Sequence, residues 1–217
     1  MANKSIKAAL FDFDGVLVDT EKLYDVFWNE MGERHHAGIP AFASVIKGST
    51  IYGIIEKYFS DRTEEEKKQI FDESNQYDRT MPMPALPGSF EFVRMLKAQG
   101  VQVGLVTSSD NAKLAHAFHE QPVMNGLFDT IVSADRITQG KPNPMCYLLA
   151  AEDLNRKPEE CLVFEDSFTG IRAGNDAGMR VIALSTTNPA EKLQDKAYRV
   201  IPNLEHCTFE DYLDWQA

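Results

Sequence analysis

Several apolar segments of this sequence end in side chains that carry carboxylate or hydroxyl groups. These side chains are Asp12, Asp14, Thr107, Ser108, Glu165 and Asp166. Neighbouring carboxylates repel one another, so such a cluster is stable only with a bound cation or with raised pKa values. A hard divalent ion such as Mg²⁺ prefers oxygen ligands and completes its shell with water and phosphate oxygens. The residue types therefore favour phosphate chemistry at a Mg²⁺ site, provided that the fold brings these segment ends together.

Asp12 and Asp14 are spaced so that both can face one ligand, because residues two apart in an extended chain project to the same side. Gly15 permits the sharp backbone turn that follows. Lys141, in the segment Gly-Lys-Pro-Asn-Pro, adds a positive point charge that can reach a phosphate group. The whole set would supply a nucleophile, an acid/base, a metal site and donors for an anion.

The elements that must position these side chains alternate between apolar strands and amphipathic helices. The predicted strands span residues 6–13, 101–106, 131–132, 161–164 and 180–184, and the helices between them span residues 89–98, 111–120, 144–155 and 169–177. Near-continuous apolar strands are typical of a sheet that is covered on both faces. Strands that alternate with helices indicate a parallel sheet, in which the strand ends converge on one edge. We therefore expect an α/β fold with a Rossmann-like open parallel sheet.

One stretch, from Thr20 to about Tyr77, interrupts this alternation because it contains no convincing buried strand. Helical spacing appears instead at residues 21–34, 50–59 and 63–77. Thr63 and Glu66 match a capping box at the start of the last of these helices. We therefore predict an α-helical cap domain at residues 18–86, inserted into a core domain that consists of residues 1–17 and 87–217.

The predicted cap contains a further candidate contact for an anion. Lys47 and Gly48 lie in the segment Lys-Gly-Ser-Thr, where a glycine-containing turn opens a predicted helix. The backbone amides of such a helix start can bind an anionic group. Lys47 and Gly48 are therefore candidates for substrate binding, and an ordinary helix start is the alternative interpretation.

The composition argues against several classes of partner. The 217 residues include 22 basic and 33 acidic side chains, which gives a formal net charge of −11. Nucleic acids and anionic membranes attract Lys and Arg, so neither is expected as a partner. No segment approaches the roughly 20 apolar residues of a membrane span, and the three widely spaced cysteines indicate neither a disulfide framework nor a zinc site. The cytoplasm is the expected location, and the sequence carries no signal for an oligomeric state.

Four motifs of the chain resemble those of the haloacid dehalogenase superfamily in their order and spacing. They are Asp-Phe-Asp-Gly-Val-Leu-Val-Asp-Thr at residues 12–20, Leu-Val-Thr at 105–107, Gly-Lys-Pro-Asn-Pro at 140–144 and Val-Phe-Glu-Asp-Ser-Phe-Thr-Gly-Ile-Arg-Ala-Gly at 163–174. The resemblance extends over essentially the whole chain. The helical insertion between the first two motifs resembles the cap of the branch that contains β-phosphoglucomutase and phosphoglycolate phosphatase.

The resemblance implies a phosphoric monoester hydrolase with a small phosphorylated metabolite, such as a sugar phosphate, as its substrate. Asp12 would be the nucleophile that forms an aspartyl-phosphate, and Asp14 would act as the general acid/base. The magnesium ligands would be the Asp12 carboxylate, the Asp14 backbone carbonyl and Asp166, with Glu165 beside them.

The phosphoryl group would be bound by residues from the second and third motifs. By the same resemblance, Thr107 and Lys141 would hold the phosphoryl group during its transfer. Ser108 and Asn111 would be further contacts to its oxygens. Alignment of the reactants and neutralisation of their charge are the main catalytic effects in phosphoryl transfer, and this set of residues suits both.

Three other functions share parts of this residue set. A β-phosphoglucomutase-like mutase would carry, by resemblance, a histidine, an arginine and a lysine in its cap, but those positions hold Tyr24, Ile51 and the lysine-free residues 73–77. Dehalogenases usually lack an acid at the position of Asp14. Response-regulator receiver domains, which are signalling modules phosphorylated on an aspartate, are shorter and have no cap. The sequence therefore favours hydrolysis of a phosphate ester, with mutase activity as the alternative.

Overall fold

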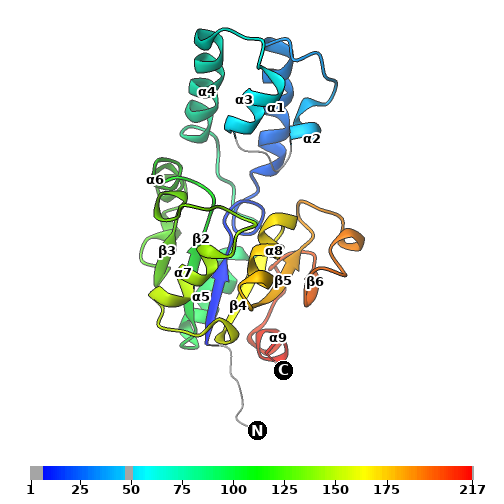
Figure 1. Ribbon diagram of the computed structural model, residues 1–217. Coiled ribbons are helices and arrows are strands. Elements are labelled where there is room, and N and C mark those ends of the chain that lie inside the picture. Colours follow the sequence, from blue (N-terminus) through cyan, green and yellow to red (C-terminus); the bar gives the residue numbers. More distant parts are fainter. Residues whose placement is uncertain (1–6, 47–50, 217) are drawn as a thin grey trace. The chain divides into compact units, whose positions relative to one another are not determined.

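The strands of the chain form a parallel sheet. The computed structural model describes residues 7–46 and 51–216. Within them the strands are β1 (Ala8–Phe11), β2 (Gln102–Val106), β3 (Thr130–Val132), β4 (Cys161–Glu165), β5 (Arg180–Leu184) and β6 (Arg199–Ile201). They lie in the order β3-β2-β1-β4-β5-β6, and all neighbouring pairs are parallel (Figure 1). The predicted α/β class with an open parallel sheet is therefore confirmed. Strand β6 was not predicted, because it is short and only partly buried.

The helices cover this sheet and build the insertion. They are α1 (Glu21–Arg34), α2 (Phe42–Ile46), α3 (Ile51–Tyr58), α4 (Glu64–Asp78), α5 (Ser89–Ala98), α6 (Asn111–Glu120), α7 (Met145–Asp153), α8 (Phe168–Asp176) and α9 (Phe209–Asp214). Short 3₁₀ turns lie at Pro122–Met124, Ala134–Arg136, Pro158–Glu160 and Ala190–Lys192. Helices α5 and α6 have the bounds that the apolar spacing predicts.

The chain divides into two compact units. One unit holds the chain up to Asp19 and from Met83 onward, and the other holds Thr20–Pro82. The sheet belongs to the first unit, and α1 to α4 form the second, which is the inserted helical cap. Within the described ranges, no helix is long and apolar enough to cross a membrane.

The chain leaves and re-enters the sheet unit at adjacent points. The segments on either side of the insertion pair with each other, at Val18 with Ala85, Asp19 with Pro84 and Leu17 with Leu86. The Asp19 amide donates to the Pro84 carbonyl at 2.8 Å, and the Leu86 amide donates to the Leu17 carbonyl at 2.9 Å. Hydrogen bonds within the sheet unit therefore join the two chain segments at which the insertion begins and ends.

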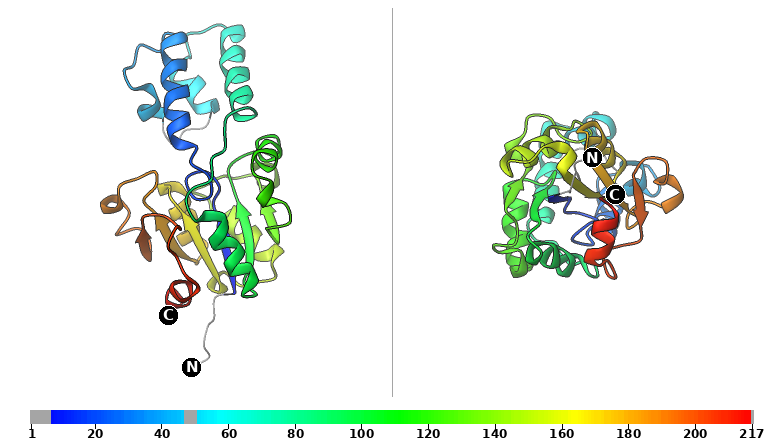
Figure 2. Two further views of the ribbon diagram at one scale, coloured as in Figure 1. Left: turned by 180° about the vertical axis from the view of Figure 1, so that it is seen from behind. Right: turned by 90° about the horizontal axis from the view of Figure 1, so that it is seen from below.

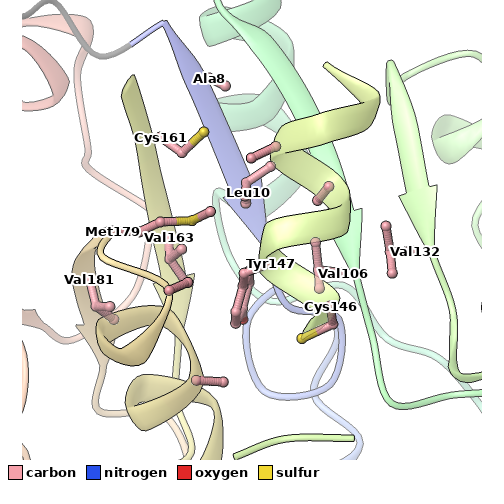
Figure 3. Close-up of a cluster of buried hydrophobic side chains, with 14 of the residues drawn as sticks. Ala8, Leu10, Val106, Val132, Cys146, Tyr147, Cys161, Val163, Met179 and Val181 are labelled. Carbon is pink, nitrogen blue, oxygen red and sulfur yellow. The ribbon is translucent and has the colours of Figure 1, made fainter. Parts of the chain in front are cut away.

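One face of the sheet is covered by α7 and α8 (Figure 1). Leu10 of β1 and Val163 of β4 point to this face, where they meet the side chain of Tyr147 from α7 (Figure 3). All three side chains are fully buried. This burial explains why the strands are apolar on this side.

The opposite face carries α5, which lies in front of the sheet in the reverse view of Figure 2. Phe11 of β1 stacks on Phe164, its neighbour in β4, with 4.6 Å between the ring centroids. Phe92 of α5 and Trp215, which follows α9, pack against this pair. Aromatic contacts of this kind add to the free energy of burial. Both faces of the central strands are thus covered.

Strand β1 lies in the centre of the sheet, and the strand order reverses beside it. The chain places β2 and β3 on one side of β1 and β4, β5 and β6 on the other. In open α/β sheets, ligands bind at the carboxyl ends of the strands, where the direction of building reverses. The ends of β1, β2 and β4 are therefore the expected location of a binding site, and each of them carries polar residues from the motifs.

The cap unit has its own apolar core. The buried members of this cluster are Phe27, Trp28, Met31, Phe42, Ala43, Ile46, Ile54, Phe59 and Ile70. At the start of α4, Thr63 accepts from the Glu66 amide and the Glu66 carboxylate accepts from the Thr63 amide, so the predicted capping box is confirmed. The Tyr24 hydroxyl of α1 donates to Asp78 at 2.6 Å, which connects α1 with α4.

Phe59 is fully buried in the cap core, so its truncation tests that packing. We expect Phe59→Ala to lower the free energy of unfolding of the cap unit by about 3–5 kcal/mol, because burial is lost and a cavity remains. Urea unfolding followed by circular dichroism measures this change. Val26→Ala, at a side chain that is 59% exposed in the same unit, is the control and should change stability by less than about 0.5 kcal/mol. Equal losses in the two variants would contradict the packing described.

Candidate active site

The Lys141 ammonium group connects the ends of three strands. Its Nζ lies 2.6 Å from Asp12 Oδ1, just after β1, and 2.6 Å from Glu165 Oε1, the last residue of β4. It also donates to the Val106 carbonyl of β2 at 3.4 Å. The Lys141 side chain is 6% exposed, and lysines are almost never so buried without a charged partner. Lys141, which the sequence predicts as a phosphate contact, therefore forms ion pairs with both Asp12 and Glu165 in this structure.

Glu165 is held by donors on both of its carboxylate oxygens. Oε1 accepts from Lys141 and from the Tyr147 hydroxyl, the latter at 3.0 Å. Oε2 accepts from the Asp166 amide, the Ser167 amide and the Ser167 hydroxyl, each at 3.0 Å. Burial raises the pKa of Glu165, but Lys141 and the Ser167 hydrogen bonds outweigh it, so the pKa is lowered. Glu165 is therefore a fixed anion beside Lys141.

Asp12 accepts fewer hydrogen bonds than Glu165, and its pKa is shifted in the opposite direction. Burial raises the pKa of Asp12 to about 7, against the opposing effect of Lys141, while the charges of Glu165 and Asp14 raise it further. For Lys141 itself, burial lowers the pKa, but Asp12 and Glu165 hold it well above its usual range. Lys141 is therefore a permanent cation. A cation bound at Asp12 would favour its ionised form, which is the form that can act as a nucleophile.

The arrangement of carboxylates fits a divalent cation. Asp12, Glu165 and Asp166 each offer an oxygen, and these oxygens lie within 4.8 Å of one another. Among the described residues, the ion pairs and the acidic group at this edge bring together the carboxylates of Asp12, Asp14, Glu165 and Asp166 and the ammonium groups of Lys113 and Lys141. With all four carboxylates ionised, this set carries two more negative than positive charges, which a hard dication with oxygen ligands would balance. Asp166 is only 2% exposed, and a buried carboxylate is costly unless a positive charge or hydrogen bonds compensate it.

Asp14 is bound by residues that the sequence analysis did not single out. Lys113 Nζ lies 2.8 Å from both carboxylate oxygens of Asp14, and the Ser109 hydroxyl donates to Asp14 at 3.2 Å. Lys113 lies on the buried side of α6 together with Leu114 and Ala117. That position on an otherwise apolar stripe is the signal that could have identified Lys113, because a lysine there must have a partner.

The hydroxyl and amide residues after β2 lie in different surroundings. Thr107 is buried, and its hydroxyl oxygen accepts from the Ser109 amide at 3.0 Å. Ser108 is exposed. Asn111, the first residue of α6, accepts from the Ser133 hydroxyl at 2.8 Å, so it is tied to the end of β3. Thr107 and Ser108 thus lie at the end of β2, as the motif predicts.

Lys47 and Gly48 lie outside the described residues. The loop after β5, which carried no predicted site residue, contacts Asp166: the Thr187 hydroxyl donates to its carboxylate, and the Asn188 side chain donates to its carbonyl at 3.0 Å. Threonine and asparagine are common in loops, so the sequence offers no signal for these contacts.

Gly170, in the first turn of α8, leaves the space that Glu165 occupies. A Cβ atom at this position would lie 1.7 Å from Glu165 Oε1. We expect Gly170→Ala to lower the free energy of unfolding by roughly 3 kcal/mol or more, because overpacking is combined with loss of a buried ion pair. Thermal or urea unfolding measures the effect.

Gly140→Ala is the matched control for this prediction. A Cβ atom on Gly140, the neighbour of Lys141, would have no heavy atom within 4 Å. This variant should stay within about 0.5 kcal/mol of the original chain. A Gly170→Ala protein as stable as the Gly140→Ala protein would contradict the position assigned to Glu165.

The chain is similar in sequence to known hydrolases. Residues 6–178 match the family model described as haloacid dehalogenase-like hydrolase. The chain is 31% identical over 194 residues to the phosphorylated carbohydrates phosphatase of Thermotoga maritima, covering 82% of this chain and 84% of that protein. It is 29% identical over 204 residues to hexitol phosphatase A of Escherichia coli, covering 93% of each.

A solved structure shows the same architecture. The crystal structure of a β-phosphoglucomutase from Clostridium difficile superposes with a TM-score of 0.78 at 27% sequence identity, and 97% of each chain is covered. The family model covers most of the sequence and includes all four motifs. The chain therefore belongs to the haloacid dehalogenase-like hydrolases.

Proposed function

We propose that this protein is a Mg²⁺-dependent phosphatase that hydrolyses a small phosphorylated metabolite, of the sugar phosphate class, through an aspartyl-phosphate on Asp12. The observation that carries the proposal is the buried Asp12 carboxylate, which lies 2.6 Å from Lys141 and within 4.8 Å of an Asp166 oxygen. In the proposed reaction, Asp12 is an oxygen nucleophile that has one permanent cation and one candidate metal ligand beside it. The names of two relatives, a phosphorylated carbohydrates phosphatase and a hexitol phosphatase, support the substrate class.

In the first half of the proposed reaction, an Asp12 carboxylate oxygen attacks the phosphorus atom of the substrate. The bond from phosphorus to the leaving oxygen breaks, and Asp14 in its protonated form gives a proton to that oxygen. Thr107 and Ser108, at the end of β2, bind oxygens of the phosphoryl group, and Lys141 offsets their charge. Asp12, the Asp14 carbonyl and Asp166 would hold a Mg²⁺ ion, which would supply further charge neutralisation.

In the second half, a water molecule attacks the phosphorus atom of the aspartyl-phosphate. Asp14, now ionised, takes a proton from this water, and the bond between phosphorus and the Asp12 oxygen breaks. Inorganic phosphate leaves, and Asp12 and Asp14 return to their initial states. In the structure, the contacts with Lys113 and Ser109 hold the Asp14 carboxylate beside the end of β2.

Phosphate release from a panel of phosphorylated metabolites tests the proposed hydrolysis. With Mg²⁺, the protein should release inorganic phosphate from at least one sugar phosphate, and Asp12→Asn should abolish release because an amide is a poor nucleophile. Asp195→Asn, at a carboxylate that is 77% exposed and pairs only locally with Lys196, is the matched control and should keep full activity. A folded protein that releases no phosphate from any member of the panel would refute the proposal.

The role of Asp14 is tested by comparing leaving groups. Asp14→Asn should lower kcat/KM for a sugar phosphate about 10²- to 10⁴-fold, because an alkoxide leaving group needs a proton. The kcat/KM for p-nitrophenyl phosphate should change much less, since p-nitrophenolate leaves without protonation. An equal loss for both substrates would contradict the proposed role, and measurement of kcat/KM is appropriate because it reports on the first phosphoryl transfer.

Mutase activity is the second candidate, because a β-phosphoglucomutase is among the similar structures. In the cap, however, Tyr24 stands where the mutases carry their histidine, and its hydroxyl is bonded to Asp78. Interconversion of glucose 1-phosphate and glucose 6-phosphate in the presence of a glucose bisphosphate primer would identify a mutase. The phosphatase proposal predicts release of phosphate without such interconversion.

A further inference from the structure

Tyr147, in the first turn of α7, contacts both members of one ion pair at the candidate site. Its hydroxyl donates to Glu165 Oε1 at 3.0 Å, and the same oxygen lies 2.6 Å from Lys141 Nζ. The centroid of its ring lies 5.1 Å from that ammonium nitrogen, which is within the range of a cation–π contact. Tyr147 is fully buried. One side chain therefore contacts the anion through its hydroxyl and the cation through its ring.

The turn that carries Lys141 is joined by hydrogen bonds to the helix that carries Tyr147. Asn143 lies between these two residues in the sequence. Its amide donates to the Gly140 carbonyl at 3.0 Å, and its side-chain oxygen accepts from the Met145 amide at 3.0 Å. The start of α7 is thus tied to the residues on both sides of Lys141, so Tyr147 and Lys141 have a fixed relation to each other.

Lys141 is shared between two carboxylates, and Tyr147 donates to only one of them. The ammonium nitrogen lies 2.6 Å from Asp12 Oδ1 and 2.6 Å from Glu165 Oε1. A hydroxyl that donates to Oε1 stabilises part of the negative charge that this oxygen presents to Lys141. Without the hydroxyl, Lys141 would be the sole donor to Oε1 among the described residues. The stronger attraction to Glu165 would then draw the ammonium group away from Asp12.

We propose that Tyr147 is a positioning residue that keeps the Lys141 ammonium group at Asp12, the carboxylate that attacks phosphorus in the proposed reaction. This inference rests on the proposed function, because Lys141 is the cation that offsets the charge of the phosphoryl group there. It assigns a role to a residue outside the four motifs, since the third motif ends at Pro144. Misplacement of a reacting or stabilising group by about 1 Å can lower a rate about 100-fold.

Nuclear magnetic resonance of lysine ammonium groups tests the positioning without substrate or metal. In the original chain labelled with ¹⁵N, the Lys141 signal, identified by its loss in Lys141→Arg, should exchange its hydrogens slowly with water, because they are buried and hydrogen-bonded. Tyr147→Phe keeps the ring but removes the hydroxyl. In this variant we expect the signal to shift and its hydrogen exchange to become about tenfold faster, since the hydrogen bond to Asp12 weakens.

The matched control is Tyr212→Phe, which removes the hydroxyl of another fully buried tyrosine. Tyr212 lies in α9, at the end of the sheet where the strands begin (Figure 1). This variant should leave the Lys141 signal unchanged. Tyr147→Met, whose flexible side chain fills space in a core, serves as a second variant in case Tyr147→Phe does not fold, and circular dichroism checks the fold of each.

Steady-state kinetics with Mg²⁺ and a hydrolysed member of the metabolite panel test the effect on the reaction. Tyr147→Phe should lower kcat about 10- to 100-fold, because the cation is no longer aligned with the reacting groups. KM should change by less than about threefold, since a fully buried Tyr147 does not contact the substrate. Tyr212→Phe should keep both values. A higher KM at unchanged kcat would overturn the inference.

Failure of this inference can be told apart from failure of the proposed function. If Tyr147→Phe leaves the ammonium signal and kcat unchanged, or changes one without the other, the inference is wrong while the phosphatase remains. Fast exchange of the Lys141 hydrogens in the original chain would also overturn it. If no member of the panel is hydrolysed, the proposed function fails, and the ammonium signal alone decides whether Tyr147 positions Lys141.

Discussion

The ion pairs of Lys141 are the interaction on which the candidate site depends. Without this ammonium group, the Asp12 and Glu165 carboxylates would face each other in a buried environment that screens charge poorly. The segment after β3 supplies the cation, and Tyr147 on the following helix supplies a hydroxyl for Glu165. One segment of the chain thus determines the electrostatics of residues that come from β1 and β4. The parallel sheet is what brings these distant segments to a common edge.

Two carboxylates share this lysine and yet have opposite shifts in pKa. Glu165 has three donors on Oε2 and two on Oε1, and its pKa is lowered. Asp12 is buried with fewer donors, and its pKa is raised to about 7. Differences in environment commonly give neighbouring carboxylates different roles. Here the surroundings of Glu165 favour its ionised form, and burial of Asp12 favours its protonated form.

The strand ends were predictable because a buried parallel strand must be apolar, so a polar residue after it marks the edge of the sheet. This is why Asp12, Thr107 and Glu165 could be placed from the sequence. The partners of these residues could not be predicted in the same way. Lys113 lies on the apolar stripe of its helix, which predicts a charged partner but not which carboxylate it contacts. Thr187 looks like an ordinary loop residue until the fold shows that it contacts Asp166. Pairwise contacts between loops depend on tertiary geometry, which local patterns do not encode.

The paired strands at the base of the insertion have a consequence for how such proteins diversify. The hydrogen bonds between Leu17 and Leu86 and between Asp19 and Pro84 seal the junction independently of what lies between them. A segment of different length or sequence can therefore be accommodated there without disturbing β1 or the residues that follow it. The inserted unit and the sheet unit can therefore change separately during evolution, because the hydrogen bonds that join the two junction segments belong to the sheet unit alone.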